Sequence, residues 1–178
     1  MQLTFEGKTK QVLLIGLYLI AIIAANLLTT HFGAWFSIIN AFVFIGLDLT
    51  TRDYLHEVWK INRWLKMGLL IASGSILSWL LNKDSGMIAI ASFSAFGLSA
   101  IVDTIVYSIL HHKSFLVKCN GSNIFSSLVD SIAFPTIAFG QFMPVIILGQ
   151  FAAKVGGGFI WSLILRRFYH VVVNTVRS

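Results

Sequence analysis

Three of the seven acidic residues in this sequence, Asp48, Asp103 and Asp130, fall within or near long apolar segments. A charge at the centre of a lipid bilayer costs about 2.5–3.5 kcal/mol on insertion scales, so it normally faces the interior of a helix bundle and a partner. The same placement suits a site for a polar solute or a coupling ion. Asp130 and Asp103 are therefore the first candidates for chemistry.

Lys154 also lies inside an apolar segment. At about 1.5 Å per residue, Asp130 and Lys154 fall near the centres of their predicted helices, and Asp103 and Asp48 lie about 7 Å toward the cytoplasm. Equal depth allows two interpretations for Asp130 and Lys154, a structural ion pair or a substrate or coupling-ion site. Arg52 follows Asp48 by four residues, which favours local pairing, whereas Asp103 has no nearby cation in the sequence.

Other polar and aromatic residues recur at helical spacing near these charges. Residues three, four or seven apart share one face of a helix. The sets are Asn40, Phe44, Asp48 and Arg52; Ser99, Asp103 and Tyr107; Asn123, Ser127, Asp130 and Phe134; and Gln150, Lys154 and Trp161. Hydrogen bonding between membrane helices is the alternative for any single residue. Four such helices together predict a common polar cavity.

The composition determines which elements must position these residues. Of 178 residues, 57% are hydrophobic and 11% charged, against about 25% charged in soluble domains. Long apolar runs predict an all-α, polytopic membrane protein of about six transmembrane helices, forming one domain over residues 1–178. The expected spans are Gln11–Thr30, Ala34–Leu49, Leu65–Leu81, Met87–Leu110, Ser122–Ile137 and Phe142–Leu165.

The segments between these spans carry further signals. Thr51–Lys66 predicts an amphipathic helix lying in the membrane interface after the second span. His111–Gly121, which contains the single cysteine Cys119, is expected to be a loop. Pro135 is expected to kink or end the fifth helix.

Basic residues set the expected orientation. Eleven of the 13 Lys and Arg residues lie on one side of the six-span arrangement, the exceptions being Lys83 and Lys154. Cytoplasmic loops carry this excess, so we expect both termini in the cytoplasm and the chain in the cell membrane. The apolar run after Lys10 is longer than a typical signal-peptide core, and we interpret it as the first span.

Two short patterns bear on packing. Ser99–Tyr107 resembles Ser126–Phe134, an internal repeat on consecutive helices that predicts a fold-back around one cavity. Gly149, Ala153 and Gly157 are four residues apart, which predicts close helix–helix approach.

Several functional classes are excluded. The net charge of +6 comes from helix ends, which argues against nucleic acid as a partner. His56-Glu57 lacks the second histidine of a zinc-protease helix, His111-His112 lacks a third ligand, and no Walker loop occurs. We expect no metal, no cofactor and no enzymatic activity.

Three segments, Phe44–Trp59, Asn120–Pro135 and Gly149–Gly158, resemble signature stretches of the VUT family, the queuosine precursor transporters. The first departs from the commoner form, since His56-Glu57-Val58-Trp59 replaces an Asn-Glu-Val-Tyr-Gly-like run. The resemblance implies import of 7-deazaguanine bases carrying a 7-cyano or 7-aminomethyl group. A membrane subunit that needs a separate energising partner, or an intramembrane hydrolase, are the alternatives.

The residues suit such a nucleobase-like cargo. A carboxylate can accept the paired N–H donors of a guanine-like edge, and aromatic rings can stack on the base. An aminomethyl cation would need a second acid. The predicted substrate contacts are Asp130, Asp103, Asn123, Asn26, Tyr107, Phe134 and Trp161, and the predicted ion-pair or coupling residues are Asp48, Arg52, Lys154 and Glu57. The oligomeric state is left open by the sequence.

Overall fold

The computed structural model describes residues 5–47, 51, 55, 59, 62–112 and 115–177. These residues are helical apart from short connections, and the described part of the chain contains no strand. The elements are α1 (Phe5–Phe32), α2 (Phe36–Asn40), the π-helix η1 (Ala41–Ile45), α4 (Arg63–Leu81), the short 3-10 helix η2 (Lys83–Ser85), α5 (Gly86–Ile109), α6 (Phe115–Phe139) and α7 (Pro144–Arg177). The all-helical prediction is confirmed.

Within the described part of the chain, three segments are long and apolar enough to cross a membrane, namely Gln11–Phe32, Lys83–Val106 and Pro144–Trp161. Phe36–Ile45 and Leu65–Leu81 are shorter apolar helices. Each expected span therefore coincides with a helical segment, while the total of six membrane crossings stays a prediction.

The start of α6 differs from the expectation. His111–Gly121 was expected to be a loop, but α6 begins at Phe115 and already includes Cys119 and Gly121. The polar residues before Gly121 suggested a loop, whereas tertiary packing explains the glycine: a Cβ on Gly121 would lie 2.7 Å from Cδ1 of Leu110. Gly121 therefore serves close packing against the end of α5.

Pro135 does not end α6, which continues to Phe139. The missing N–H of a proline removes only one helical hydrogen bond, that to the carbonyl four residues earlier, here Ser131. The helix stops instead at Gly140, whose φ of 66° lies in the left-handed region that glycine adopts without steric cost.

The segment expected to lie in the membrane interface is described only at a few positions. There, Thr51, Leu55 and Trp59 are buried within the protein. Leu55 and Trp59 belong to an apolar cluster with Leu14, Tyr18 and Ile22 of α1 and Met67, Leu70 and Ile71 of α4. These two side chains therefore face the protein core. Most of the segment lies outside the described residues, so its placement in the membrane interface stays a prediction.

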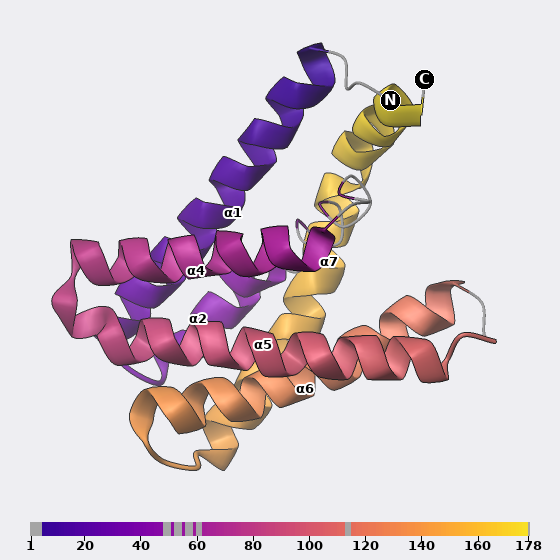
Figure 1. Ribbon diagram of the computed structural model, residues 1–178. Coiled ribbons are helices and arrows are strands. Elements are labelled where there is room, and N and C mark those ends of the chain that lie inside the picture. The colour runs from indigo at the N-terminus through magenta and orange to yellow at the C-terminus, as the bar shows by residue number, and fades with distance from the viewer. Residues whose placement is uncertain are drawn as a thin grey trace.

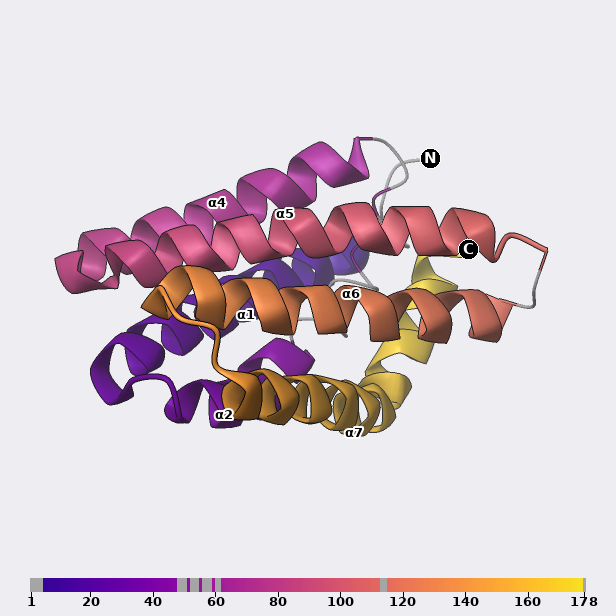
Figure 2. The same cartoon turned by 90° about the horizontal axis from the view of Figure 1, so that it is seen from below.

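The helices fold back on one another in sequence order. Figures 1 and 2 show α4, α5 and α6 packed as successive layers, with α5 and α6 in contact along their lengths. The internal repeat thus lies on a packed helical pair, as the fold-back prediction requires. The first turns of α1 and the last turns of α7 lie at the same end of the molecule (Figure 1).

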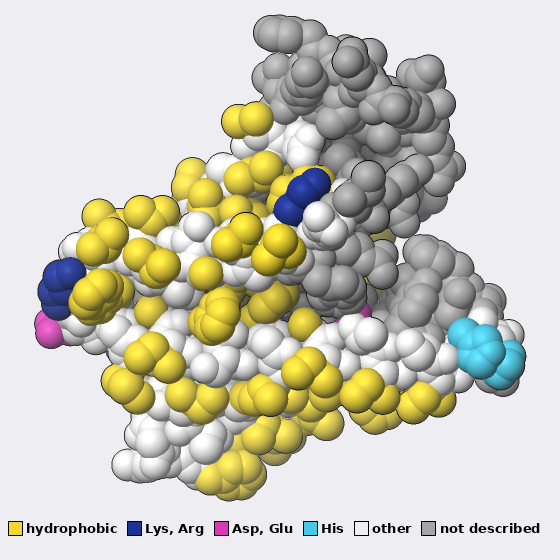
Figure 3. All heavy atoms as spheres, in the orientation of Figure 1, with side chains coloured by type: hydrophobic (Ala, Val, Ile, Leu, Met, Phe, Trp, Pro, Cys, Tyr) yellow, Lys and Arg dark blue, Asp and Glu magenta, His cyan; other side chains and the backbone are white. Residues whose placement is uncertain are grey.

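The outer surface is largely apolar. Figure 3 shows hydrophobic side chains covering the visible sides of α4 and α5, with charged side chains at the helix ends. Exposed large residues include Ile76 and Leu80 of α4 and Ile90, Ile101 and Ile105 of α5. Monomeric soluble proteins rarely expose so much contiguous apolar surface, and a lipid-facing surface accounts for it.

The glycine stripe of α7 packs against α2 and η1, which confirms the prediction of close approach. A Cβ on Gly157 would lie 2.3 Å from the carbonyl oxygen of Phe42, and one on Gly149 would lie 2.6 Å from Cδ1 of Ile38. A Cβ on Gly46, which follows η1, would lie 2.7 Å from the carbonyl carbon of Gly157. The backbone of α7 is therefore in direct contact with the backbone of the η1 segment.

Substituting Gly157 tests this contact. Gly157→Ala forces a methyl group onto a backbone carbonyl, so we expect a loss of about 1–3 kcal/mol in stability, seen as a lower apparent Tm in detergent. Gly158→Ala is the matched control, because a Cβ there meets nothing within 4 Å. Equal Tm values for the two variants would contradict the packing interpretation.

Candidate functional site

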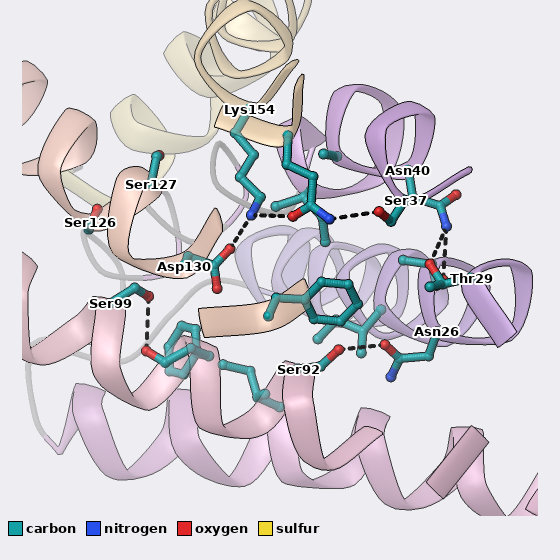
Figure 4. Close-up of a pocket in the computed structure, with 18 of the residues that line it drawn as sticks. Asn26, Thr29, Ser37, Asn40, Ser92, Ser99, Ser126, Ser127, Asp130 and Lys154 are labelled. Atoms are coloured by element: carbon teal, nitrogen blue, oxygen red, sulfur yellow. Dashed lines mark hydrogen bonds and ion pairs between the residues drawn. The ribbon is translucent and has the colours of Figure 1, made fainter. Parts of the chain in front are cut away.

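A pocket opens between the helices near the middle of the bundle, enclosing about 790 Å³ of space between atoms, its opening included. Its walls come from both halves of the chain, as Figure 4 shows. The polar and charged lining residues are Tyr18, Asn26, Thr29, Ser37, Asn40, Ser92, Ser99, Ser126, Ser127, Asp130, Gln150 and Lys154. Ile22, Ala25, Ala41, Ile45, Ile71, Phe96 and Phe134 complete the wall.

An ion pair joins α6 to α7 at one side of the pocket. Nζ of Lys154 lies 2.6 Å from Oδ2 of Asp130. The Lys154 side chain is 3% exposed and that of Asp130 is 22% exposed. Lys154 also donates to Oγ of Ser131 at 3.1 Å and to Oε1 of Gln150 at 3.3 Å. The buried ammonium is thus neutralised and fully hydrogen-bonded, which is the condition for burying such a charge.

A hydrogen-bond chain extends from this ion pair to α2. Nε2 of Gln150 donates to Oγ of Ser37 at 2.7 Å, and Ser37 donates to the carbonyl oxygen of Ala34. Because the Ser37 hydrogen is used on Ala34, its oxygen must accept from Gln150, which leaves Oε1 of Gln150 facing Lys154. The chain fixes the direction of the glutamine amide and, through it, of the lysine.

Two asparagines, Asn26 and Asn40, join the helices of the opposite wall by hydrogen bonds. Nδ2 of Asn26 donates to Oγ of Ser78 at 3.1 Å, and Oγ of Ser92 donates to Oδ1 of Asn26 at 2.6 Å. Nδ2 of Asn40 donates to the carbonyl oxygen of Ala25 and to Oγ1 of Thr29. These bonds connect α1 to α2, α4 and α5 and hold the wall in a defined geometry.

The backbone beside the pocket is irregular. Ala41 and Ile45, the first and last residues of η1, both line it. π-helical turns are rare and are frequent at functional sites. This segment carries the Phe42 carbonyl that Gly157 approaches, so the π-helix and the glycine contact lie together at the α2–α7 side of the pocket.

Comparison with known proteins places this site in context. Residues 7–169 match the model of a family described as "Putative vitamin uptake transporter". The chain belongs to this family. The matched range includes every described residue that lines the pocket.

A curated relative carries a more specific name. The chain is 31% identical over 143 residues to the "Probable queuosine precursor transporter" of Haemophilus influenzae, covering 71% of this chain. It spans about 60% of the length of that relative. No solved structure matches the chain.

The structure brings some predicted site residues together and not others. Asn26, Asp130 and Phe134 line the pocket. Lys154 forms an ion pair with Asp130, which was one of the two interpretations that their equal depth allowed. Asp103, Asn123 and Trp161 are not among the described residues that line it. Outside the described part of the structure lie Asp48, Arg52, Glu57 and the Tyr107 side chain.

Asp103 and Asn26 have environments that the sequence did not anticipate. Oδ1 of Asp103 is buried with no hydrogen-bond partner among the described residues. Asn26 was predicted to be a substrate contact, but both ends of its amide are engaged with serines of α4 and α5. It therefore acts first as a link between helices.

Sequence reasoning did not select several residues that form the pocket. Ser37, Thr29 and Ser92 were missed because isolated hydroxyls in membrane helices usually serve packing. Asn40 and Gln150 were noticed in polar stripes but not chosen as site residues. For Gln150 the signal was its position one helical turn before Lys154.

Neutralising one partner of the ion pair should reveal its energetic role. Asp130→Asn or Lys154→Gln leaves one buried charge without its partner, so each is expected to destabilise the protein by about 3–5 kcal/mol. The double variant removes both charges and should recover most of that loss. The measurement is the apparent Tm of all three proteins in the same detergent. Additive losses in the double variant would argue against a coupled pair.

Proposed function

We propose that the protein imports a queuosine precursor, a 7-deazaguanine base, across the cell membrane into the cytoplasm. Membership of a transporter family and the printed name of the Haemophilus influenzae relative support the class of cargo. The observation that carries the proposal is a carboxylate, Asp130, at the wall of a pocket inside the helix bundle. Both termini are proposed to face the cytoplasm, in agreement with the distribution of basic residues.

The chemistry of the pocket fits a guanine-like edge. Such an edge presents neighbouring N–H and amino donors, and a carboxylate is an acceptor for both. Oδ2 of Asp130 contacts Lys154, and its other oxygen has no partner among the described residues. The aromatic rings of Phe96 and Phe134 line the same pocket and supply faces for stacking on a flat base.

Uptake by the purified protein in liposomes tests the proposal. We expect accumulation of a labelled 7-deazaguanine without any other protein, and competition by unlabelled 7-deazaguanine but not by a pyrimidine base. Uptake that appears only when a second protein is added would support the alternative of a partner-dependent subunit. A complete lack of binding and uptake of 7-deazaguanines would refute the proposed cargo.

Asp130→Asn tests the role of the carboxylate. We expect the variant to insert into the membrane but to lose uptake, because an amide offers one acceptor and an N–H that opposes the donors of the base. The double variant Asp130→Asn with Lys154→Gln should remain inactive even where its stability recovers, which separates function from folding. Asp84→Asn is the matched control, since Asp84 is exposed at the α4–α5 connection, outside the pocket. Normal uptake by Asp130→Asn would remove this residue from the site.

A further inference from the structure

Asp103 is an acid within an apolar helix that takes no part in the ion pair of the pocket. It belongs to Lys83–Val106, a segment long and apolar enough to cross a membrane. Its Oδ1 atom is buried without a hydrogen-bond partner among the described residues. At the matching position of the internal repeat, Asp130 has Lys154 at 2.6 Å, whereas no cation of the described part forms an ion pair with Asp103. The two repeated acids thus differ in how their charge is balanced.

The elements around Asp103 offer it no cationic partner in the described part of the bundle. Asp103 is the one charged residue of α5. The titratable side chains described on the elements that pack against α5 are Tyr18, His31, Lys66, Lys83, Asp84 and Asp130. The cations among them, and His111 and His112 beyond the end of α5, are exposed.

Asp103 lies at the level of the pocket along the α5–α6 pair. These helices are antiparallel and in contact along their lengths (Figure 2), and Leu110 lies against Gly121. Going back from Leu110 to Asp103 along α5 corresponds to going forward from Gly121 by about seven residues along α6. That position is next to Ser127, which lines the pocket.

Serine hydroxyls form the pocket wall on this side. Ser99, one helical turn before Asp103, lines the pocket together with Ser126 and Ser127 of α6. Figure 4 shows these three serines on the side of Asp130 that is away from the two asparagines. Asp103 is therefore one helical turn from the wall of the proposed substrate pocket.

An unpaired charge at this place affects how a carrier changes conformation. Alternating access requires the pocket to close to one side of the membrane before it opens to the other. While both sides are closed, a carboxylate without a cation costs more free energy than corresponds to a tenfold change in population. A bound proton removes the charge and turns one oxygen into an O–H donor. Proton binding at Asp103 thus favours the closed intermediate.

We infer that Asp103 binds a proton that is carried together with the substrate. The proton joins an oxygen of Asp103 from the external solution, crosses while the base is held at Asp130, and leaves to the cytoplasm, where Asp103 becomes a carboxylate again. This inference rests on the proposed function and adds its energy source, a proton gradient.

A proton suits this position better than a metal ion does. A hard cation such as Ca²⁺ takes six or more oxygen ligands, about as many as a small site can supply. Among the described residues, no group of three His, Cys, Asp or Glu side chains lies close enough together to hold a metal ion. A proton requires only one oxygen, which Asp103 supplies.

Accumulation by the wild-type protein in liposomes tests the coupling. Labelled 7-cyano-7-deazaguanine is supplied outside, with the membrane potential clamped at zero and the exterior one pH unit more acidic. We expect accumulation approaching about tenfold for one proton per base, because one pH unit is a tenfold ratio of protons. Accumulation driven by a sodium gradient at equal pH, and not by the pH gradient, would overturn the choice of a proton.

Asp103→Asn imitates the protonated acid but has no proton to release. We expect the pH gradient to produce no accumulation in this variant, because its amide crosses without carrying a proton. Counterflow, the exchange of external labelled base for internal unlabelled base, should remain, since exchange needs no net proton movement. A misfolded protein would lose both activities, so the split separates coupling from folding.

Three variants serve as controls. Asp103→Glu keeps a carboxylate and should retain accumulation. Asp84→Asn alters an acid exposed at the α4–α5 connection and should retain it as well. Asp130→Asn should lose both accumulation and counterflow, because it removes a proposed contact to the base.

The outcomes separate this inference from the proposed function. If the wild-type protein shows neither uptake nor counterflow of 7-deazaguanines, the proposed function itself fails. Counterflow without accumulation in the pH gradient would overturn only the proton coupling. If Asp103→Asn does not fold, Asp103→Ser, which also lacks the acid, should show the same split. Wild-type accumulation by either folded variant, or loss of counterflow in both, would overturn the assignment of the proton to Asp103.

Discussion

The ion pair between Asp130 and Lys154 is the interaction around which the pocket is organised. Either charge alone would be costly inside an apolar bundle, so α6 and α7 are held in the one register that brings the two together. The 2.6 Å contact leaves little freedom to slide one helix along the other. The other N–H donors of the buried Lys154 ammonium also need acceptors, and Ser131 and Gln150 supply them. Through Gln150 and Ser37, the same network reaches α2, which lies far away in the sequence.

This network is possible only because α7 approaches the α2–η1 segment very closely. Gly157 lies against the carbonyl of Phe42, and Gly149 lies against Ile38. A side chain at Gly157 would collide with this backbone carbonyl, whereas one at Gly149 would have to displace the end of the Ile38 side chain. The glycines therefore support the polar chain indirectly, since they bring the backbone of α2 near enough for Ser37 to accept from Gln150.

On the opposite wall of the pocket, the helices are joined by amide side chains and not by an ion pair. Asn26 connects α1 with α4 and α5, and Asn40 connects α2 with α1. Such interhelical hydrogen bonds contribute modest energy in membranes but give defined geometry. Among the residues that the structure describes, the pocket thus combines one ion pair with amides held in fixed positions, and the side chain of Asp130 remains partly exposed.

The sequence by itself determined the membrane class, the approximate positions of the helices, and the presence of the charged residues Asp130 and Lys154 inside apolar helices. These features depend on local quantities: the length of apolar runs, the helical period, and the cost of a charge at a given depth. The helical period also identified the glycine stripe of α7, because residues four apart lie on the same face of a helix.

Only the tertiary structure decided which helical faces meet. Asp103 and Asp130 occupy matching positions in an internal repeat, yet Asp130 lines the pocket and Asp103 is not among the described residues that do. Ser37 and Gln150 become partners although 113 residues separate them, and Asn26 uses its amide to join helices. Gly121 lies within α6, where its Cα packs close to the end of the Leu110 side chain. Depth and periodicity constrain a residue within its own helix, but the rotation of one helix against another is set by side-chain packing from the whole bundle, which no single segment of sequence contains.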